Sequence, residues 1–360
     1  MKTRIKKNLC IFCFYNRNGI VSEYVYVLLE HLKSVSARLI FVANGVLNDT
    51  GKSRVSDYTN EIIVRENVGR DYGAYRDIIV GYIGNEQLRQ YENVILCNDT
   101  FLGFFRPFKD IFLEMQNKDG DLWGIDRVHR GILDHIQSYL LVFRKKIISD
   151  NSLWNYFESN EIEDDSFGET GALIETKLYR HFKESGYKLD SYIYTDHYSI
   201  YASPYECVTQ YGLPIIKKKS FLESVCSKDN LKNAISFVVE NRLYNNEIIE
   251  KEPFRDAVVE SPPTERICDA IITEADLINF SSEKFYIFGA GLVAKEIYYT
   301  YFKNNKNFCG FVVSEPQNDT FFSIKDIRQD ANIILGVNYK IQREVINIIP
   351  NTMNKLVIWE

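Results

Sequence analysis

The chain has 360 residues, of which 45% are hydrophobic and 14% aromatic, and its formal net charge is −6. A chain of this length can bury one large core or two unequal ones, and we expect two domains. The negative charge argues against a nucleic-acid-binding protein, whose contact surface would be basic. No apolar stretch approaches the length of a membrane span, and the N-terminal apolar run is too short for a signal peptide, so we expect a cytoplasmic protein.

The seven cysteines show no regular spacing of the kind that metal ligands have. Cys10 and Cys13 form a C-x-x-C pair, but both lie in the apolar run 9–14, which predicts a strand. Residues three apart on a strand point to opposite faces of the sheet. We therefore expect packing roles for these thiols instead of redox or zinc chemistry.

The first hundred residues alternate predicted strands and helices, judged from apolar runs and from apolar side chains recurring every three or four positions. The predicted strands cover residues 9–14, 38–43, 61–65 and 93–97, and the predicted helices cover 20–33 and 73–82. This order predicts an α/β fold with an open, mainly parallel sheet flanked by helices. Ligands bind such sheets at the carboxyl ends of the strands, where Tyr15, Asn44, Asn67 and Asp99 would gather.

The pattern changes after the first predicted domain, residues 1–225. Residues 226–282 are charged and indicate a helical connector, with apolar-periodic pieces at 231–242 and 266–272. Residues 283–360 predict a small Rossmann-like α/β domain, in which strand 285–288 runs into Gly289-x-Gly291-x-x-Ala294, a helix and strand 308–313. This unit is about half of a full dinucleotide domain, so both a bound nucleotide and a structural or docking role are open for it.

The most informative stretch joins a glycine-bearing loop to a carboxylate. Arg65-Glu-Asn-Val-Gly-Arg-Asp-Tyr-Gly73 opens the helix 73–82, and strand 93–97 then runs directly into Asn98-Asp99-Thr100. An open α/β sheet presents charge to a ligand in this way. A diphosphate with a divalent cation is the natural ligand of such an edge.

These motifs carry a family resemblance. The first 225 or so residues resemble the rhamnan synthesis F family of bacterial glycosyltransferases and, more broadly, the larger group of family 2 glycosyltransferases of GT-A fold. The further matching motifs, in chain order, are Leu122-Trp-Gly124, His135-Ile-Gln-Ser-Tyr139, Ile174-Glu175 before Gly186-Tyr187, and Leu213-Pro-Ile-Ile-Lys217. The resemblance implies inverting transfer of a sugar, rhamnose in the name family, from a nucleotide-diphosphate donor to a surface polysaccharide or lipid-linked acceptor.

The resemblance also implies roles on the donor side. Asp99 is in the place where GT-A enzymes bind Mg²⁺ or Mn²⁺ against the donor phosphates. The motif here is Asn98-Asp99-Thr100, with one aspartate where two are usual, so a turn-forming role for Asp99 is the alternative. Asp71 is either a donor contact or a cap of the following helix. The other predicted donor-binding residues are Tyr15, Asn44, Asn67, Gly69 and Asn98.

On the acceptor side, Glu175 is the expected general base, because its spacing to Gly186 matches the acidic residue that opens the corresponding helix in family 2 enzymes. Stabilisation of a carboxylate by the helix dipole is the alternative explanation, and Glu169 is the competing base. His135 is expected either to contact acceptor or phosphate or to have a structural role. His197, beside Asp196, is a candidate metal ligand.

Residues 217–219 are three lysines that either meet a lipid-linked diphosphate or an anionic membrane surface, or form a solvated turn. A membrane contact would be peripheral, at the inner face of the membrane. Two other classes of function stay open. One is a nucleotide-dependent oxidoreductase or sugar-modifying enzyme that uses the C-terminal Gly-x-Gly unit, and the other is a non-catalytic scaffold.

Overall fold

The computed structural model describes residues 7–128, 133–195, 198–223, 225–251, 274–316 and 320–337, together with 345, 348–350 and 352–357. Its contacts divide the chain into two compact units. The first unit contains residues 1–128, 136–161 and 181–260, and the second contains 129–135, 162–180 and 261–360. The predicted limits 1–225, 226–282 and 283–360 divide the chain in sequence order, whereas these units interleave along it.

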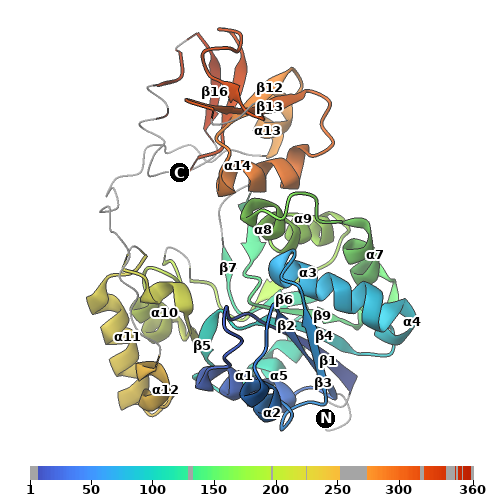
Figure 1. Ribbon diagram of the computed structural model, residues 1–360, viewed down its shortest axis with the longest axis vertical. Helices are drawn as coiled ribbons and strands as arrows, with labels where there is room; N and C mark the ends of the chain where they lie inside the picture. The colour runs from blue at the N-terminus through green and yellow to red at the C-terminus, as the bar shows by residue number, and fades with distance from the viewer. Residues whose placement is uncertain are drawn as a thin grey trace. The chain divides into compact units, whose positions relative to one another are not determined.

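A seven-stranded sheet forms the centre of the first unit; Figure 1 labels most of its strands. The strand order is β10-β6-β9-β4-β1-β2-β3. Its neighbouring strands run parallel except at β9, which is antiparallel to both β4 and β6. The bounds are β1 Asn8–Phe14, β2 Arg38–Asn44, β3 Glu61–Arg65, β4 Asn93–Asn98, β6 Leu122–Gly124, β9 Leu140–Arg144 and β10 Leu189–Ser191. The predicted α/β class with an open, mainly parallel sheet is therefore confirmed.

The central strand β1 shows why apolar runs predicted this sheet. All seven of its residues are buried, and it pairs in parallel with β2 on one side and β4 on the other. A parallel strand covered on both faces is expected to be a continuous apolar run. Cys10 and Cys13 lie within it, 0% and 2% exposed, and burial raises the pKa of both thiols. Their environment supports the predicted packing role.

Helices cover both faces of this sheet: α1, α2 and α5 lie on one side and α3, α4 and α7 on the other (Figure 1). The predicted helix 20–33 is α1, which starts slightly later, at Glu23, after the N-cap Ser22. The predicted helix 73–82 starts earlier, at Arg70, and continues as a π-helical segment, η2. The bounds are α1 Glu23–Lys33, α2 Asp49–Val55, α3 Arg70–Arg76, η2 Asp77–Ile83, α4 Gly84–Leu88, α5 Phe108–Gln116, α6 Lys145–Ser149 and α7 Ser152–Ser159.

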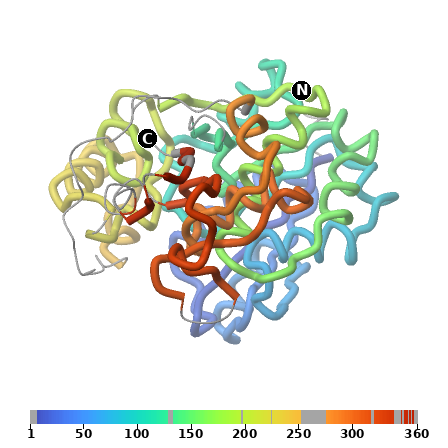
Figure 2. The backbone as a smooth tube through the Cα atoms, turned by 90° about the horizontal axis from the view of Figure 1, so that it is seen from above, coloured from blue at the N-terminus to red at the C-terminus, as the bar shows by residue number. Residues whose placement is uncertain are grey.

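Three further helices, α10, α11 and α12, form a group at one side of the first unit (Figure 1, Figure 2). The helix predicted over 231–242 is α11, whereas the piece predicted over 266–272 lies outside the described residues. A short antiparallel pair, β5 and β11, precedes a turn of 3-10 helix, η4. The bounds are β5 Phe101–Gly103, β7 Arg127–Val128, β8 His135–Ile136, α10 Pro204–Tyr211, β11 Ile215–Lys217, η4 Lys218–Phe221, α11 Lys228–Glu240 and α12 Asn246–Glu250.

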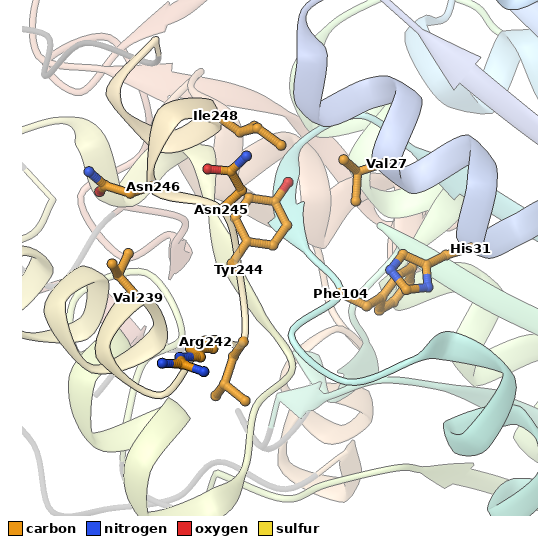
Figure 3. A pocket seen from close by; sticks show the side chains of 10 residues that line it. Val27, His31, Phe104, Val239, Arg242, Tyr244, Asn245, Asn246 and Ile248 are labelled. Atoms are coloured by element: carbon orange, nitrogen blue, oxygen red, sulfur yellow. The ribbon is translucent and has the colours of Figure 1, made fainter.

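A cavity of about 510 Å³ lies between α1 and the connection from α11 to α12 (Figure 3). Val27 and His31 of α1 face Tyr244 and Ile248 across it. These two α1 residues are on later turns than Tyr24, which contacts the carboxyl end of β4. The cavity is therefore separate from the edge where ligands of such sheets bind.

The second unit contains a five-stranded sheet of order β14-β13-β12-β15-β16, in which all neighbouring strands are parallel. The predicted strands 285–288 and 308–313 are confirmed as β12 and β13. In the described part of the chain, no helix is long and apolar enough to span a membrane. The bounds are α8 Phe167–Ile174, α9 Thr176–Glu184, α13 Glu274–Phe280, β12 Phe285–Phe288, α14 Leu292–Ile297, the π-helical η5 Tyr298–Phe302, β13 Phe308–Val313, β14 Phe322–Ser323, β15 Asn332–Leu335 and β16 Asn354–Val357.

Candidate active site

Arg65 stabilises the conformation of the glycine-bearing loop between β3 and α3. Its guanidinium donates from Nη2 to the carbonyl oxygen of Val68 (2.9 Å) and from Nη1 to Oδ1 of Asn44 (2.7 Å). Gly73 permits the tight turn, because a Cβ atom there would lie 2.2 Å from the Val68 carbonyl oxygen. The loop ends at Gly69, the N-cap of α3, so α3 begins at Arg70 and not at Gly73 as predicted.

Four polar side chains form a hydrogen-bonded chain where β4 ends. Asn98 Nδ2 donates to Asp71 Oδ2 (2.9 Å), the Thr100 hydroxyl donates to Asn98 Oδ1 (2.6 Å), and Lys217 Nζ donates to Thr100 Oγ1 (2.7 Å). An amide can donate to one neighbour and accept from the other, whereas an aspartate at position 98 would face Asp71 as a like charge. The arrangement explains why asparagine precedes Asp99 in this chain.

The lysines of the 217–219 run do not form the predicted solvated turn or a membrane-facing patch. Lys217 is 5% exposed, and its ammonium group lies 4.2 Å from the centre of the Tyr139 ring. Lys218 is partly buried and donates to the Tyr24 hydroxyl (2.7 Å), so only Lys219 is fully exposed. The pairing of β11 with β5 accounts for this, because it places Lys217 beside the end of β4. Two cations are thus held at the edge where β4 ends.

Asp99 follows β4 and is 7% exposed. Its carboxylate accepts from the Tyr24 hydroxyl (3.2 Å) and from the backbone N–H of Tyr15. Burial raises the pKa of Asp99, while the nearby charge of Lys218 opposes that rise. The carboxylate therefore has a fixed orientation and a cation beside it.

The other predicted donor-binding residues divide into two groups. Asn44 is 2% exposed and donates from Nδ2 to the Arg70 carbonyl oxygen (2.8 Å), and Gly69, with φ +73°, is the N-cap of α3. Tyr15 is 50% exposed at the end of β1, and Asn67 is exposed in the loop before α3. Asn44 and Gly69 thus shape the loop, whereas the side chains of Tyr15 and Asn67 are exposed, and donor contact by them stays a prediction.

Asp99 is the one predicted metal ligand within the described residues, since His197 and Asp196 lie outside them. In the described ranges no group of three or more His, Cys, Asp or Glu side chains is arranged to hold a metal ion. Mg²⁺ is commonly bound through one or two carboxylates, substrate phosphates and water. Asp99 fits that kind of shared site, in which the substrate supplies most of the ligands.

The sequence analysis missed Asp126, a carboxyl group just after β6. Asp126 is 1% exposed and accepts hydrogen bonds from the Thr195 hydroxyl (3.3 Å) and from the backbone N–H groups of Arg127 and Thr195. Since β4 and β6 are both antiparallel to β9, Asp99 and Asp126 follow strands that end at the same edge. Burial raises the pKa of Asp126 to about 7. The sequence signal was the same as for Asp99: an acidic residue that closes an apolar run.

We expect Asp126 to make stability depend on pH. Its pKa of about 7 in the folded chain exceeds the value of roughly 3.9 for an unfolded aspartate, so its contribution is most favourable below the unfolded value and is lost as pH rises through about 7. Urea unfolding should show that the stability of wild type relative to Asp126→Asn falls by roughly 2–3 kcal/mol between pH 5 and pH 8. The exposed Asp57→Asn serves as the control, and a pH-independent difference for Asp126→Asn would contradict the expectation.

The two residues predicted on the acceptor side meet in the second unit. His135 Nδ1 lies 2.8 Å from the carbonyl oxygen of Leu133, which can only accept, so Nδ1 carries a proton. Nε2 of the same ring faces Oε2 of Glu175 at 3.5 Å. An unprotonated Nε2 and an ionised carboxylate would both be acceptors, so the pair is favourable when it holds one proton on either group. The Glu175 side chain is 23% exposed, which leaves it accessible to a substrate.

Glu175 lies at the start of a helix, as the sequence predicted. It ends α8, and its carbonyl oxygen accepts from the Tyr179 N–H (2.8 Å) in the first turn of α9. The competing base, Glu169, is 0% exposed and accepts from the three backbone N–H groups of residues 163–165. Glu169 therefore folds the loop before α8, and Glu175 is the more accessible carboxylate of the two.

The Gly289–Gly291 loop joins β12 to α14 in the predicted order. Gly289 has φ +109°, and a Cβ atom there would lie 2.8 Å from the carbonyl oxygen of Gly336. The first turn of α14 packs on α8, where a Cβ atom on Gly168 would lie 2.8 Å from the Leu292 carbonyl oxygen. These close approaches explain why glycine occupies Gly289 and Gly168, and both roles stay open for the loop.

Comparison with known proteins identifies a family. A family model described as rhamnan synthesis protein F matches residues 39–302. The matched segment begins in β2 and ends in η5, so it extends beyond the first 225 residues and includes parts of both compact units.

Two curated relatives match over part of their length. An uncharacterized protein, y4gN, of Sinorhizobium fredii is 25% identical over 190 residues, which are 52% of this chain and 49% of the relative. The virulence protein VirA of Vibrio anguillarum is 26% identical over 184 residues, which are 50% of this chain and 58% of the relative. The chain thus spans about half the length of the curated relatives it matches.

Two solved structures illustrate distant matches. A protein described as a glucose-1-phosphate thymidylyltransferase from Bacillus anthracis, in complex with sucrose, has a TM-score of 0.32 at 8% identity and covers 52% of this chain and 87% of its own. A 4-diphosphocytidyl-2C-methyl-D-erythritol synthase from Anaerococcus prevotii has a TM-score of 0.34 at 15% identity, with coverage of 55% and 91%. Scores this low carry no argument about activity.

Proposed function

Because the chain belongs to the rhamnan synthesis protein F family, which implies a role in making a cell-surface polysaccharide, we propose that it is an inverting glycosyltransferase of GT-A type. The proposed donor is a nucleotide-diphosphate sugar, with deoxythymidine diphosphate rhamnose as the first candidate. The proposed acceptor is a growing glycan or a lipid-linked glycan. The observation that carries the proposal is the set of charged groups where β4 ends, with Asp99, Lys217 and Lys218 held in place by hydrogen bonds.

On the donor side, the site has to stabilise the negative charge that develops on the departing diphosphate. The ammonium groups of Lys217 and Lys218 supply positive charge close to Asp99. Mg²⁺ or Mn²⁺ held by Asp99 would, when bound, neutralise the phosphates further. The exposed side chains of Tyr15 and Asn67 are the proposed contacts to the nucleoside.

On the acceptor side, Glu175 accepts the proton of the attacking hydroxyl group. The hydroxyl oxygen then forms a bond to C1 of the donor sugar, while the bond between C1 and the phosphate oxygen breaks and the diphosphate leaves with the electron pair. With both ring nitrogens protonated, His135 orients Glu175 by directing the Nε2 proton at its carboxylate, which stays ionised and able to act as the base. A single displacement of this kind inverts the configuration at C1.

Donor binding tests the proposed function directly. The purified protein is titrated by calorimetry with deoxythymidine, uridine and guanosine diphosphates and their sugars, each with Mg²⁺, with Mn²⁺ and with chelator. We expect one of these nucleotides to bind and to raise the melting temperature, because a ligand of the native state alone stabilises it. Binding of NAD(H) with no response to any sugar nucleotide would overturn the proposal in favour of the oxidoreductase alternative.

A further inference from the structure

The segment that carries Glu175 is attached to the C-terminal part of the second unit by a buried hydroxyl pair. Oγ1 of Thr176, the residue after Glu175, lies 2.7 Å from Oγ1 of Thr300 in η5, and these two threonines are 1% and 8% exposed. One turn further along α9, the Arg180 guanidinium lies 4.5 Å from the centre of the Tyr301 ring. Contacts in both turns therefore hold α9 on η5.

Helix α8 and the loop before it are also attached to the C-terminal part of the second unit. Asp164 pairs with Lys295 of α14 (2.5 Å), and Glu163 pairs with Lys303 (2.9 Å). At Gly168, the close approach of α8 to α14 leaves no room for a side chain. These ion pairs are partly exposed and contribute little stability each, but they fix the loop before α8 on α14 and on the residue that follows η5.

His135 is attached through its neighbour Leu133. The Leu133 side chain is 0% exposed, in an apolar core that it shares with Leu277, Phe285 and Ile297. The carbonyl oxygen of Leu133 holds Nδ1 of His135. Both members of the His135–Glu175 pair are thus anchored to the C-terminal α/β unit, independently of each other.

We propose that the second unit positions the acceptor-side base, with Thr300 as the positioning residue that holds Glu175 against His135 through Thr176. The inference rests on the proposed function of Glu175. On this proposal, the second unit holds the acceptor-side residues of the reaction in place.

The consequence for the reaction follows from geometry. Removing the Thr300 hydroxyl leaves that of Thr176 without its buried partner, and the first turn of α9 shifts to relieve this. A displacement of about 1 Å at a reacting group lowers a rate by up to about a hundredfold. Thr300→Val, which keeps the side-chain shape, should therefore lower kcat roughly ten- to a hundredfold, while donor affinity stays unchanged.

Matched variants separate positioning from general destabilisation. Thr300→Ser keeps the hydroxyl and should restore most of kcat. Thr170→Val removes another buried hydroxyl in the same unit, one that donates to the Ser166 carbonyl oxygen (2.9 Å), and should leave kcat near wild type. In a Glu175→Gln background, Thr300→Val should cause no further loss, because both changes act through one group.

A readout without turnover keeps this inference separate from the proposed function. The imidazole of His135 is assigned in NMR spectra with a His135→Gln variant, and its ring chemical shifts are compared at one pH in wild type, Thr300→Val and Thr170→Val. We expect these chemical shifts to change in Thr300→Val alone, because Glu175 moves away from Nε2. Failure of wild type to transfer sugar would count against the proposed function, whereas unchanged His135 ring shifts in Thr300→Val would overturn the positioning role.

Discussion

Asp99→Ala should lower sugar transfer at least about a hundredfold, the usual cost of losing a main electrostatic contact to a leaving group. The Tyr24 hydroxyl and the Tyr15 N–H orient the Asp99 carboxylate, and Lys218 lies beside it. The pKa of Asp99 is raised by burial, so transfer should be lost, as pH falls, at a higher pH than an exposed aspartate would require. Steady-state transfer and its pH profile are the measurements, with circular dichroism to show that the fold is intact.

The same variant distinguishes the two sources of positive charge. If a chelator abolishes transfer by wild type, a cation at Asp99 neutralises the diphosphate. If a chelator has no effect while Asp99→Ala is inactive, Lys217 and Lys218 perform this role and Asp99 orients them. The exposed Asp49→Asn, at the start of α2, serves as the control. Turnover by Asp99→Ala equal to that of wild type would remove Asp99 from the site.

Sequence reasoning located the strands well because their signal is local. The strands predicted over 9–14 and 93–97 differ from β1 and β4 by one residue at one end, since each is a buried apolar run next to a loop. The direction of β9 has no such signal, because reversing a strand leaves its apolar pattern unchanged. The packing of residues 162–180 with the C-terminal helices α14 and η5 depends on contacts such as Thr176–Thr300, which no periodicity reveals.

The candidate site was predictable where it follows from strand ends. Asp99 was found because an acidic residue closes an apolar run, and Asp126 was missed although it has the same property. The partnership of Asn98 with Asp71 joins two elements 27 positions apart and is visible only in the fold. For Lys217 the sequence pattern was misleading. A run of charged residues is usually solvated, yet the pairing of β11 with β5 buries the Lys217 side chain.

Glu175→Gln should lower acceptor-dependent transfer by roughly a hundred- to ten thousandfold, the usual range for loss of a general base. The amide keeps the size of the side chain and its hydrogen bonding but cannot take the proton of the acceptor hydroxyl. Donor affinity should stay close to that of wild type, because Asp99, Lys217 and Lys218 belong to the first unit and are unchanged. Calorimetry with the donor and transfer to a lipid-linked acceptor are measured on the same preparation.

Glu169→Gln is the matched control for this variant, because the two glutamates are six positions apart and only Glu169 accepts from the three N–H groups of residues 163–165. It should lower the melting temperature more than Glu175→Gln does and lower transfer less per folded molecule.

Intact donor binding with lost transfer in Glu175→Gln supports Glu175 as the base. Intact transfer in that variant would pass the role to another carboxylate, with Asp126 the first to test because it follows β6 at the edge that also holds Asp99. Loss of both donor binding and transfer would mean that Glu175 maintains the structure of the chain, and the base would then have to be sought elsewhere.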